Sequence, residues 1–225
     1  MSNKIAICVS TYNRLDAFKI CIRHHRMHKV KDAAFFVVED GGANESVGGW
    51  ADYRFPDRVG IPRVKNRCLE LAMDWGADHI FLFDDDCFPV ADNWHLPYIQ
   101  SAQHHLCFTF LQSVGKVDGL KIHALGNGCM LYFSRKCIET VGGFDTDFGF
   151  GKFEHTEFSH RIHNAGLTPY VFMDVIGSDK LFHSMDEHDE VLRTMTNTEM
   201  DAQMKRNAPL FNAKRNDRHF KDYRL

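Results

Sequence analysis

The sequence predicts an α/β protein, a single domain built on one mixed, mostly parallel sheet flanked by helices. Within residues 5–83, three short apolar runs of the kind found in strands buried on both faces alternate with two segments of helical periodicity. Such alternation is typical of parallel strands joined by crossover helices. Each apolar run ends in polar or acidic residues, and open α/β sheets bind ligands at the carboxyl ends of their strands.

The composition is that of a globular protein. The chain has 225 residues, 44% of them hydrophobic and 25% charged, which is enough to bury one full core. Its net charge of -3 argues neither for nor against a nucleic-acid partner. No apolar run approaches the length of a membrane span, and the N-terminus lacks a signal-peptide pattern. The seven cysteines form no CxxC pair and fall mostly in apolar segments, so we expect reduced thiols and a cytoplasmic protein.

The elements before residue 90 are strongly patterned. We expect strands at 5–9, 34–38 and 79–83, each a short apolar run. The helix after the first strand carries Leu15, Phe18 and Ile22 on one face, and a second helix over 61–75 repeats this spacing. The glycine-rich segment between them, to about residue 60, is expected to be a loop with one short helix.

The pattern beyond residue 90 is weaker. We expect helices at 93–105, 134–142 and 153–165, and strands at 106–111, 130–133 and 170–172. Ser134 is suited to cap the second of these helices, and Gly166 to close the third. From residue 184 the chain is polar and weakly periodic, and its last twenty residues are rich in Lys and Arg.

Three adjacent aspartates, Asp84, Asp85 and Asp86, follow the third predicted strand. Neighbouring carboxylates repel one another and lose solvation when buried, and a hard divalent cation such as Mg²⁺ or Mn²⁺ relieves both costs. The sequence therefore indicates a metal site at the end of this strand, with an acidic turn as the simpler alternative. Neither a GxGxxG dinucleotide fingerprint nor a Walker A loop is present.

Several short motifs resemble, in order, those of the family 2-like glycosyltransferases of the GT-A fold, which transfer a sugar from a nucleotide-sugar donor. They are Val9 to Arg14, Val37 to Gly42, Gly60 to Asn66, the DxD-like Phe83 to Asp86, Gly142 to Asp145, and Glu154 to Arg161. The resemblance covers residues 4–185 and implies a Rossmann-like GT-A domain over 1–185. Its nucleotide-binding half would span about 1–90 and its acceptor half about 91–185, followed by a helical, basic extension over 186–225.

The resemblance implies roles around a donor, which we expect to be a UDP-sugar. Asp84 and Asp86 would bind Mn²⁺ or Mg²⁺, completed by His183, with His188 as the second choice, while Asp85 would contact the ribose. A bound metal stabilises the charge that develops on the leaving diphosphate. The resemblance places these residues around the nucleotide: Ser10, Thr11, Arg14, Glu39, Asp40, Arg63 and Asn66.

The catalytic base is expected at the start of the acidic helix. Inverting relatives commonly carry an aspartate in a Glu-Asp pair there, whereas this chain has Glu154 followed by His155, so either residue could accept the proton. The stereochemical outcome stays open. Glu157 and Arg161 are four residues apart on one helix face and are expected to form a structural ion pair. Zinc binding by His160 and His163 is not favoured, because no cysteine or further histidine follows at a matching spacing.

The acceptor is the open question. A glycan is one class, and a hydroxymethylated DNA base is another, because aromatic residues interleave with the basic residues of the C-terminal end. Two other functions compete with sugar transfer. A sugar nucleotidyltransferase would carry a glycine-rich basic loop after the first strand, which Ser10 to Arg14 does not resemble. A non-catalytic nucleotide- or sugar-binding module would not need the intact aspartates.

Overall fold

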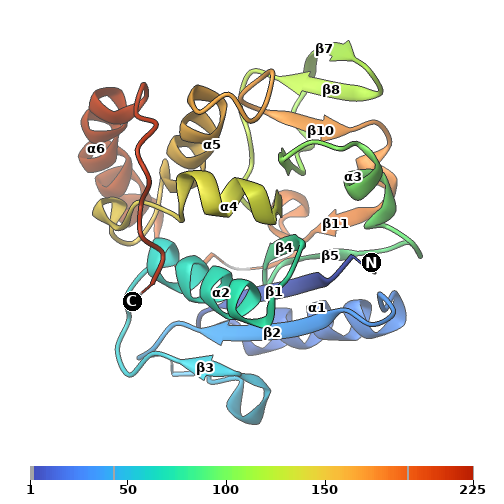
Figure 1. Ribbon diagram of the computed structural model, residues 1–225. Coiled ribbons are helices and arrows are strands. Elements are labelled where there is room, and N and C mark those ends of the chain that lie inside the picture. Colours follow the sequence, from blue (N-terminus) through green and yellow to red (C-terminus); the bar gives the residue numbers. More distant parts are fainter. Residues whose placement is uncertain (1–2, 43, 192, 225) are drawn as a thin grey trace.

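A computed structural model describes residues 3–42, 44–191 and 193–224 (Figure 1). Its centre is a six-stranded sheet in the order β3-β2-β1-β4-β9-β6. The first four strands in this order are parallel, β9 is antiparallel to β4, and β6 is antiparallel to β9. The predicted mixed, mostly parallel sheet is therefore confirmed. The strands are β1 (Ile5–Thr11), β2 (Ala34–Glu39), β3 (Tyr53–Arg54), β4 (His79–Asp84), β6 (His105–Cys107) and β9 (Met130–Ser134).

Two hydrophobic cores lie on opposite faces of this sheet. Alternate side chains of β1 belong to different cores, Ile7 and Val9 to one and Ala6 and Cys8 to the other, as the two-residue period of a strand requires. The apolar stripe of α1 (Leu15–Met27) belongs to the first core and that of α2 (Ile61–Trp75) to the second. The second core also includes residues of α4 (Arg135–Val141) and α5 (Glu154–Asn164).

Two small sheets complete the fold. One joins β7 (Ser113–Val117), β8 (Leu120–His123) and β10 (Met173–Val175), and the other joins β5 (Cys87–Pro89) to β11 (Phe182–Ser184). The second pair is important for the site, because it returns the chain to the aspartates: the Met185 amide donates to the Asp86 carbonyl at 2.8 Å. Short helical turns are η1 (Gly48–Trp50), η2 (Thr146–Phe148), η3 (Ser178–Lys180) and η4 (Asp186–His188).

The weakly patterned region departs from the prediction in several places. The helix expected over 93–105 is reduced to α3 (Leu96–Gln100), which ends before Ala102 with its positive φ of 56°. The strand expected over 106–111 ends at Cys107, and the one expected over 170–172 lies three residues later. The β7–β8 hairpin was not predicted, because β7 is half exposed and its sequence is polar.

The C-terminal segment packs against the rest of the domain. Helix α6 (Asn197–Lys214) begins with a capping box between Thr196 and Glu199. Figure 1 shows α6 beside α5, with the tail then running back toward α2. The tail is attached by a bridge between Gly142 and Lys221 and by the buried ring of Tyr223, which is 4% exposed.

All seven cysteines are free and buried. Burial raises the pKa of the thiols of Cys8, Cys21 and Cys87. The expectation of reduced core thiols agrees with this arrangement. Across the described residues, no helix is both long enough and apolar enough to cross a bilayer.

Candidate active site

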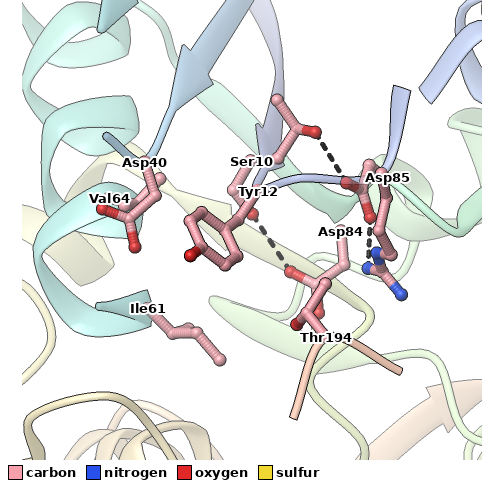
Figure 2. Close-up of a pocket in the computed structure, with 10 residues that line it drawn as sticks. Ser10, Tyr12, Asp40, Ile61, Val64, Asp84, Asp85 and Thr194 are labelled. Atoms are coloured by element: carbon pink, nitrogen blue, oxygen red, sulfur yellow. Dashed lines mark hydrogen bonds and ion pairs between the residues drawn. The ribbon is translucent and has the colours of Figure 1, made fainter. Parts of the chain in front are cut away.

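The carboxyl ends of β1, β2 and β4 meet at one edge of the sheet. Ladder pairing aligns Thr11 with Glu39 and Ser10 with Asp84, as expected from the polar strand ends. A cavity of about 100 Å³ opens at this edge (Figure 2). It is lined by Ser10, Thr11, Tyr12, Arg14, Asp40, Ile61, Val64, Asp84, Asp85 and Thr194.

Each of the three aspartates accepts a hydrogen bond from a residue at the end of β1 or just after it. The Ser10 hydroxyl donates to Asp84 Oδ1 at 3.1 Å, and the Thr11 hydroxyl donates to Asp85 Oδ2 at 2.6 Å. The Arg14 guanidinium donates to Asp86 Oδ2 at 2.9 Å and also to Asp85. Ser10, Thr11 and Arg14, predicted as nucleotide contacts, therefore surround the aspartates on the wall of the cavity.

The carboxylates lie close together in a poorly solvated site. Burial, reinforced by Asp85 and Asp84 against the opposing effect of Arg14, raises the pKa of Asp86 to about 7. Burial opposes the charge of Arg14, but Asp85 and Asp86 outweigh it and raise the pKa of the guanidinium. The cluster is thus short of positive charge even with Arg14 bound to it.

The oxygen donors of Asp84 and Asp86 have the chemistry that Mg²⁺ or Mn²⁺ requires. In the present arrangement Arg14 bridges Asp85 and Asp86, so the guanidinium would have to move for Asp86 to bind a metal. Within the described residues, no group of three or more His, Cys, Asp and Glu side chains is placed to hold an ion. The residues fit a divalent cation in chemistry, and the fit requires Arg14 to leave.

His183, predicted as the third metal ligand, pairs with Glu190 and not with the aspartates in this structure. Its Nε2 lies 2.8 Å from Glu190 Oε2, and its ring packs on Phe88 and stacks on His188 at 4.5 Å. The β5–β11 pairing sets this position, because it places His183 opposite Phe88. His188, the second choice, contacts the Ser184 carbonyl at 2.7 Å instead.

Lys65 is a site residue that the sequence reasoning missed. Its ammonium pairs with Asp84 Oδ1 at 2.9 Å and donates to the Gly128 carbonyl at 2.8 Å, although its side chain is only 2% exposed. Burial opposes its charge, but Asp84 and then Glu154 raise its pKa. A signal was present, since Lys65 lies three residues before Cys68 on the apolar face of α2, where a lysine needs a charged partner.

A second cavity of about 230 Å³ continues from the first and shares Arg14, Ile61, Asp84 and Thr194 with it. The other residues that line it are Asn127, Gly128, Phe150, Lys152, Phe153, Glu154, His155, Asp186, Arg193, Met195 and Met200. The segment after β11 therefore covers both cavities. One continuous cleft connects Asp40 to Glu154 past the aspartates.

Glu154 combines burial with an unused oxygen. Its Oε1 lies 3.3 Å from His155 Nδ1, while Oε2 is buried with no hydrogen-bond partner among the described residues. Burial alone would raise the pKa of Glu154, but the hydrogen bond and charge of His155, and then Lys65, lower it to about 2. Glu154 is therefore an ionised carboxylate that lines the second cavity and has one buried oxygen without a hydrogen-bond partner among the described residues.

Three predicted nucleotide contacts have other positions. Glu39 is 1% exposed and holds the loop after β2, accepting from the Ser46 hydroxyl at 3.0 Å and the Val47 amide at 2.9 Å. Asn66 is fully buried and bonds both backbone groups of Phe144, at 2.7 and 2.9 Å. Arg63 is exposed on the first turn of α2 and lines neither cavity. The side chains of Glu39 and Asn66 thus hold backbone groups in place, and none of the three residues lines either cavity.

Asp40 does line the first cavity, yet it also organises the loop before α2. Its carboxylate accepts from the amides of Gly41, Val59 and Gly60 at 2.7–3.0 Å. Burial outweighs these bonds and raises the pKa of Asp40. Arg58, which the sequence analysis did not select, lies over the Tyr12 ring at 4.3 Å and over the Phe150 ring at 5.0 Å, so it contacts one residue that lines each cavity.

The Glu157–Arg161 pair is structural, as predicted. Both side chains are fully buried and meet at 2.9 Å. Arg161 also donates to the carbonyls of Val141 and Gly143, which lie before the Phe144-Asp145 segment. Asp145 in turn binds Lys214 of α6 at 2.6 Å. These contacts of the predicted acceptor-side motif therefore hold the backbone of residues 141–145 in place.

Comparison with known proteins supports this fold. No protein-family profile matches the chain. An uncharacterized glycosyltransferase of Acanthamoeba polyphaga mimivirus is 26% identical over 198 residues, covering 75% of this chain and 77% of the relative. The mannosyltransferase PcManGT from Pyrobaculum calidifontis, solved in complex with GDP-Man and Mn²⁺, superposes with a TM-score of 0.57 at 15% identity. That match covers 76% of this chain, which spans 55% of the length of PcManGT.

A second solved structure agrees. Residues 1–349 of TarS from S. aureus superpose with a TM-score of 0.58 at 10% identity, covering 93% of this chain and 72% of that one. The chain therefore has the mixed α/β fold of glycosyltransferases, and the resemblance to the GT-A type noted from the motifs is confirmed.

Proposed function

We propose that the protein is a metal-dependent glycosyltransferase, which moves a sugar from a nucleoside-diphosphate sugar to an acceptor hydroxyl. The observation that carries this proposal is the cleft whose two cavities share Asp84 and Arg14. Sugar transfer brings the leaving diphosphate of the donor and the attacking hydroxyl of the acceptor to one carbon atom of the sugar. The cleft offers cationic and carboxylate groups at its centre and an ionised carboxylate at one end.

In this proposal the nucleotide binds at the first cavity. Tyr12, Ile61 and Val64 give it an apolar wall for a base, and Asp40 supplies carboxylate oxygens that accept hydrogen bonds. Arg14 lies where it can meet the diphosphate once it leaves the aspartates. A divalent cation bound by Asp84 and Asp86 would stabilise the charge on that diphosphate. Neither the base nor the metal is fixed by these contacts, so UDP-sugars and Mn²⁺ or Mg²⁺ remain our proposal alongside GDP-sugars.

Glu154 is the group that we propose to accept the proton of the acceptor. Glu154 lines the second cavity, its buried Oε2 has no partner among the described residues, and an ionised carboxylate can accept a hydrogen bond from a hydroxyl without first losing a proton. His155 would then be a positioning residue, since its imidazole lies against Glu154 Oε1 and keeps that oxygen occupied. The aromatic ring of Phe150, 41% exposed, offers a stacking surface for an acceptor sugar.

A glycan is the acceptor class that these contacts favour. A hydroxymethylated base in DNA is the second class, proposed from the basic C-terminal end. Much of that charge is already paired, because Lys214 contacts Asp145 and Asp147, and Lys221 contacts Asp145 and Asp217. The pairing reduces the attraction available for phosphates.

The proposal is tested by donor turnover. The purified protein is incubated with a panel of UDP-, GDP- and other nucleotide sugars, each with Mn²⁺, Mg²⁺ or chelator, and release of the nucleoside diphosphate is measured. We expect metal-dependent turnover of one donor, reduced at least 100-fold by Asp86→Asn, since such metal contacts contribute several kcal/mol. Asp179→Asn, at a surface aspartate paired with Lys121, is the matched control and should retain activity.

Two other outcomes would identify a different function. Release of pyrophosphate from a nucleoside triphosphate and a sugar 1-phosphate would indicate a nucleotidyltransferase. Tight donor binding by calorimetry with no turnover under any acceptor or metal condition would indicate a binding module. Absence of both turnover and nucleotide binding would contradict the proposal altogether.

A further inference from the structure

The segment before Glu154 has an unusual backbone. Gly149 and Gly151 have φ values of 63° and 123°, and the next two residues, Lys152 and Phe153, have φ values of 69° and 70°. Two consecutive residues with side chains in the left-handed region are costly, because Cβ then crowds the backbone. Such a conformation persists only when its surroundings hold it in place.

Asn207 of α6 provides that support. It is the only buried residue that α6 contributes among the described residues, and it is 0% exposed. Its Nδ2 donates to the carbonyls of Phe148, Gly151 and Lys152 at 2.9, 2.6 and 3.0 Å. The three carbonyls can surround this buried amide only when the backbone follows its present path. An apolar side chain could fill the same space without requiring that path.

The supported segment connects the two halves of the cleft. A Cβ on Gly60, at the start of α2, would lie 2.4 Å from the Gly149 carbonyl oxygen, so the segment lies directly on the donor side. A Cβ on Gly151 would lie 3.7 Å from Glu154 Oε2, so it also borders the free carboxylate oxygen. Phe150, which lies between Gly149 and Gly151, lines the second cavity. A displacement of this backbone would move both Glu154 and Phe150.

We propose that Asn207 is a positioning residue for sugar transfer, acting from a position on α6 that does not line the cleft. Its carboxamide fixes residues 149–153 in their left-handed path, so that Glu154 and Phe150 face the acceptor. This inference rests on the proposed function for its catalytic consequence. The structural part, a clamp on residues 149–153, does not depend on that function.

The first experiment compares Asn207→Ala and Asn207→Asp with wild type. By hydrogen–deuterium exchange, we expect the amides of residues 149–155 to exchange at least tenfold faster, with no change in β1 and β4. Nucleotide affinity by calorimetry should stay within about twofold, while donor turnover falls about tenfold or more. Asn164→Ala is the matched control, because that amide also ties α5 to the C-terminal segment, through the carbonyls of Arg215 and Asp217. It should leave exchange at 149–155 and turnover unchanged.

A second variant separates strain from general instability. Glycine adopts positive φ without strain, so Lys152→Gly should raise the melting temperature in the Asn164→Ala background, where Asn207 still holds the strained path. It should raise the melting temperature less in Asn207→Ala, where residues 149–153 can already relax. An equal increase in both backgrounds, or unchanged exchange at 149–155, would overturn the clamp. Faster exchange there with unaltered turnover would retain the clamp and refute its role in transfer. A wild-type protein without turnover would instead count against the proposed function alone.

Discussion

Arg14 and Lys65 are the two cations that hold the aspartates in this structure. Arg14 bridges Asp85 and Asp86, while Lys65 pairs with Asp84 from the buried side. The two side chains differ in freedom: Lys65 is fixed between Asp84 and Gly128, whereas Arg14 is 17% exposed and lines both cavities. We therefore expect Arg14 to be the cation that a metal displaces.

Arg14→Met should strengthen metal binding by the protein without nucleotide. Removing the guanidinium leaves Asp85 and Asp86 uncompensated, so Mn²⁺ affinity should rise about tenfold or more, equivalent to about 1.4 kcal/mol. The measurement is free Mn²⁺ by electron paramagnetic resonance during titration. Arg58→Met removes a cation near Asp40 that does not contact the aspartates, so its effect should be much smaller. An affinity that falls in Arg14→Met would show that the arginine does not compete with the ion.

Two buried histidines, His25 and His105, should make the free energy of unfolding depend on pH. Burial lowers the pKa of His25 to about 3 and that of His105 to about 4. Both are neutral in either state above the unfolded pKa of about 6.5, and below it the unfolded chain binds protons that the folded one refuses. The unfolding free energy should therefore fall between about pH 6.5 and pH 4, by up to about 1.4 kcal/mol per pH unit for each histidine.

The two histidines should respond differently to replacement by phenylalanine. His25 Nε2 has no partner among the described residues and its ring packs against Phe83, whereas His105 bonds the Tyr132 carbonyl and the Ser159 hydroxyl. His25→Phe should raise stability at pH 7 by about 1 kcal/mol and weaken the acid loss, while His105→Phe should destabilise by about 1–3 kcal/mol. Urea unfolding at pH 7 and pH 5 measures both effects. An unaltered pH slope in His25→Phe would show that this histidine is not the source.

At the scale of elements, the tail is attached at a position that admits only glycine. Gly142 and Gly166 share a φ of 77°, but a Cβ at Gly142 would lie 1.8 Å from the Lys221 carbonyl oxygen, whereas at Gly166 it would meet nothing within 4 Å. Alanine is strained at both positions because φ is positive, and more so at Gly142, whose ψ of -144° lies close to a region almost restricted to glycine. The difference between the two variants therefore combines this extra strain with the contact to the tail.

Gly142→Ala should accordingly destabilise by at least about 2 kcal/mol more than Gly166→Ala, since the backbone must shift to relieve the overlap. Thermal melts of the two variants give this difference. Limited trypsin digestion should also release the tail after Lys221 or Arg218 only in Gly142→Ala. Equal melting temperatures would mean that the tail lies elsewhere in solution.

The elements that the sequence predicted best are those with a strong hydrophobic period. Strands β1, β2 and β4 and helices α1 and α2 were placed within a few residues, because each is buried on a continuous face. The β5–β11 pair could not be predicted, since it depends on contacts between residues almost a hundred positions apart. That pair sets the position of His183, which it places opposite Phe88.

Site residues show the same distinction. Asp84 to Asp86 could be selected from the sequence because adjacent carboxylates after an apolar strand repel one another and lose solvation, which indicates a compensating partner. Glu39 and Asn66 lie in equally suitable motifs, yet burial turned their hydrogen bonds toward the backbone. A motif alone does not show whether a side chain will bond to the backbone or face a ligand. Asn207 carried no signal, because its role depends on the path of a loop more than fifty residues earlier.

At the scale of the whole molecule, charge is balanced locally. The net charge is -3, and the basic C-terminal end is attached by its own ion pairs, including Arg224 with Asp74. We therefore expect no binding to a 20-base-pair DNA duplex at about 0.1 M salt, as measured by fluorescence anisotropy. Micromolar binding that weakens steeply with salt would contradict this expectation and favour DNA as the acceptor.

The reaction of the seven buried thiols with a labelling reagent can report local opening of the structure. They are distributed over β1, α1, α2, β5, β6, α4 and the turn before β9, and none is more than 7% exposed. Only a thiolate reacts with disulfide or alkylating reagents, and a buried thiol cannot meet them while the structure is closed. Each labelling rate therefore measures how often one element separates from the core, so mass spectrometry of partly labelled protein would order the elements by local stability without any mutation.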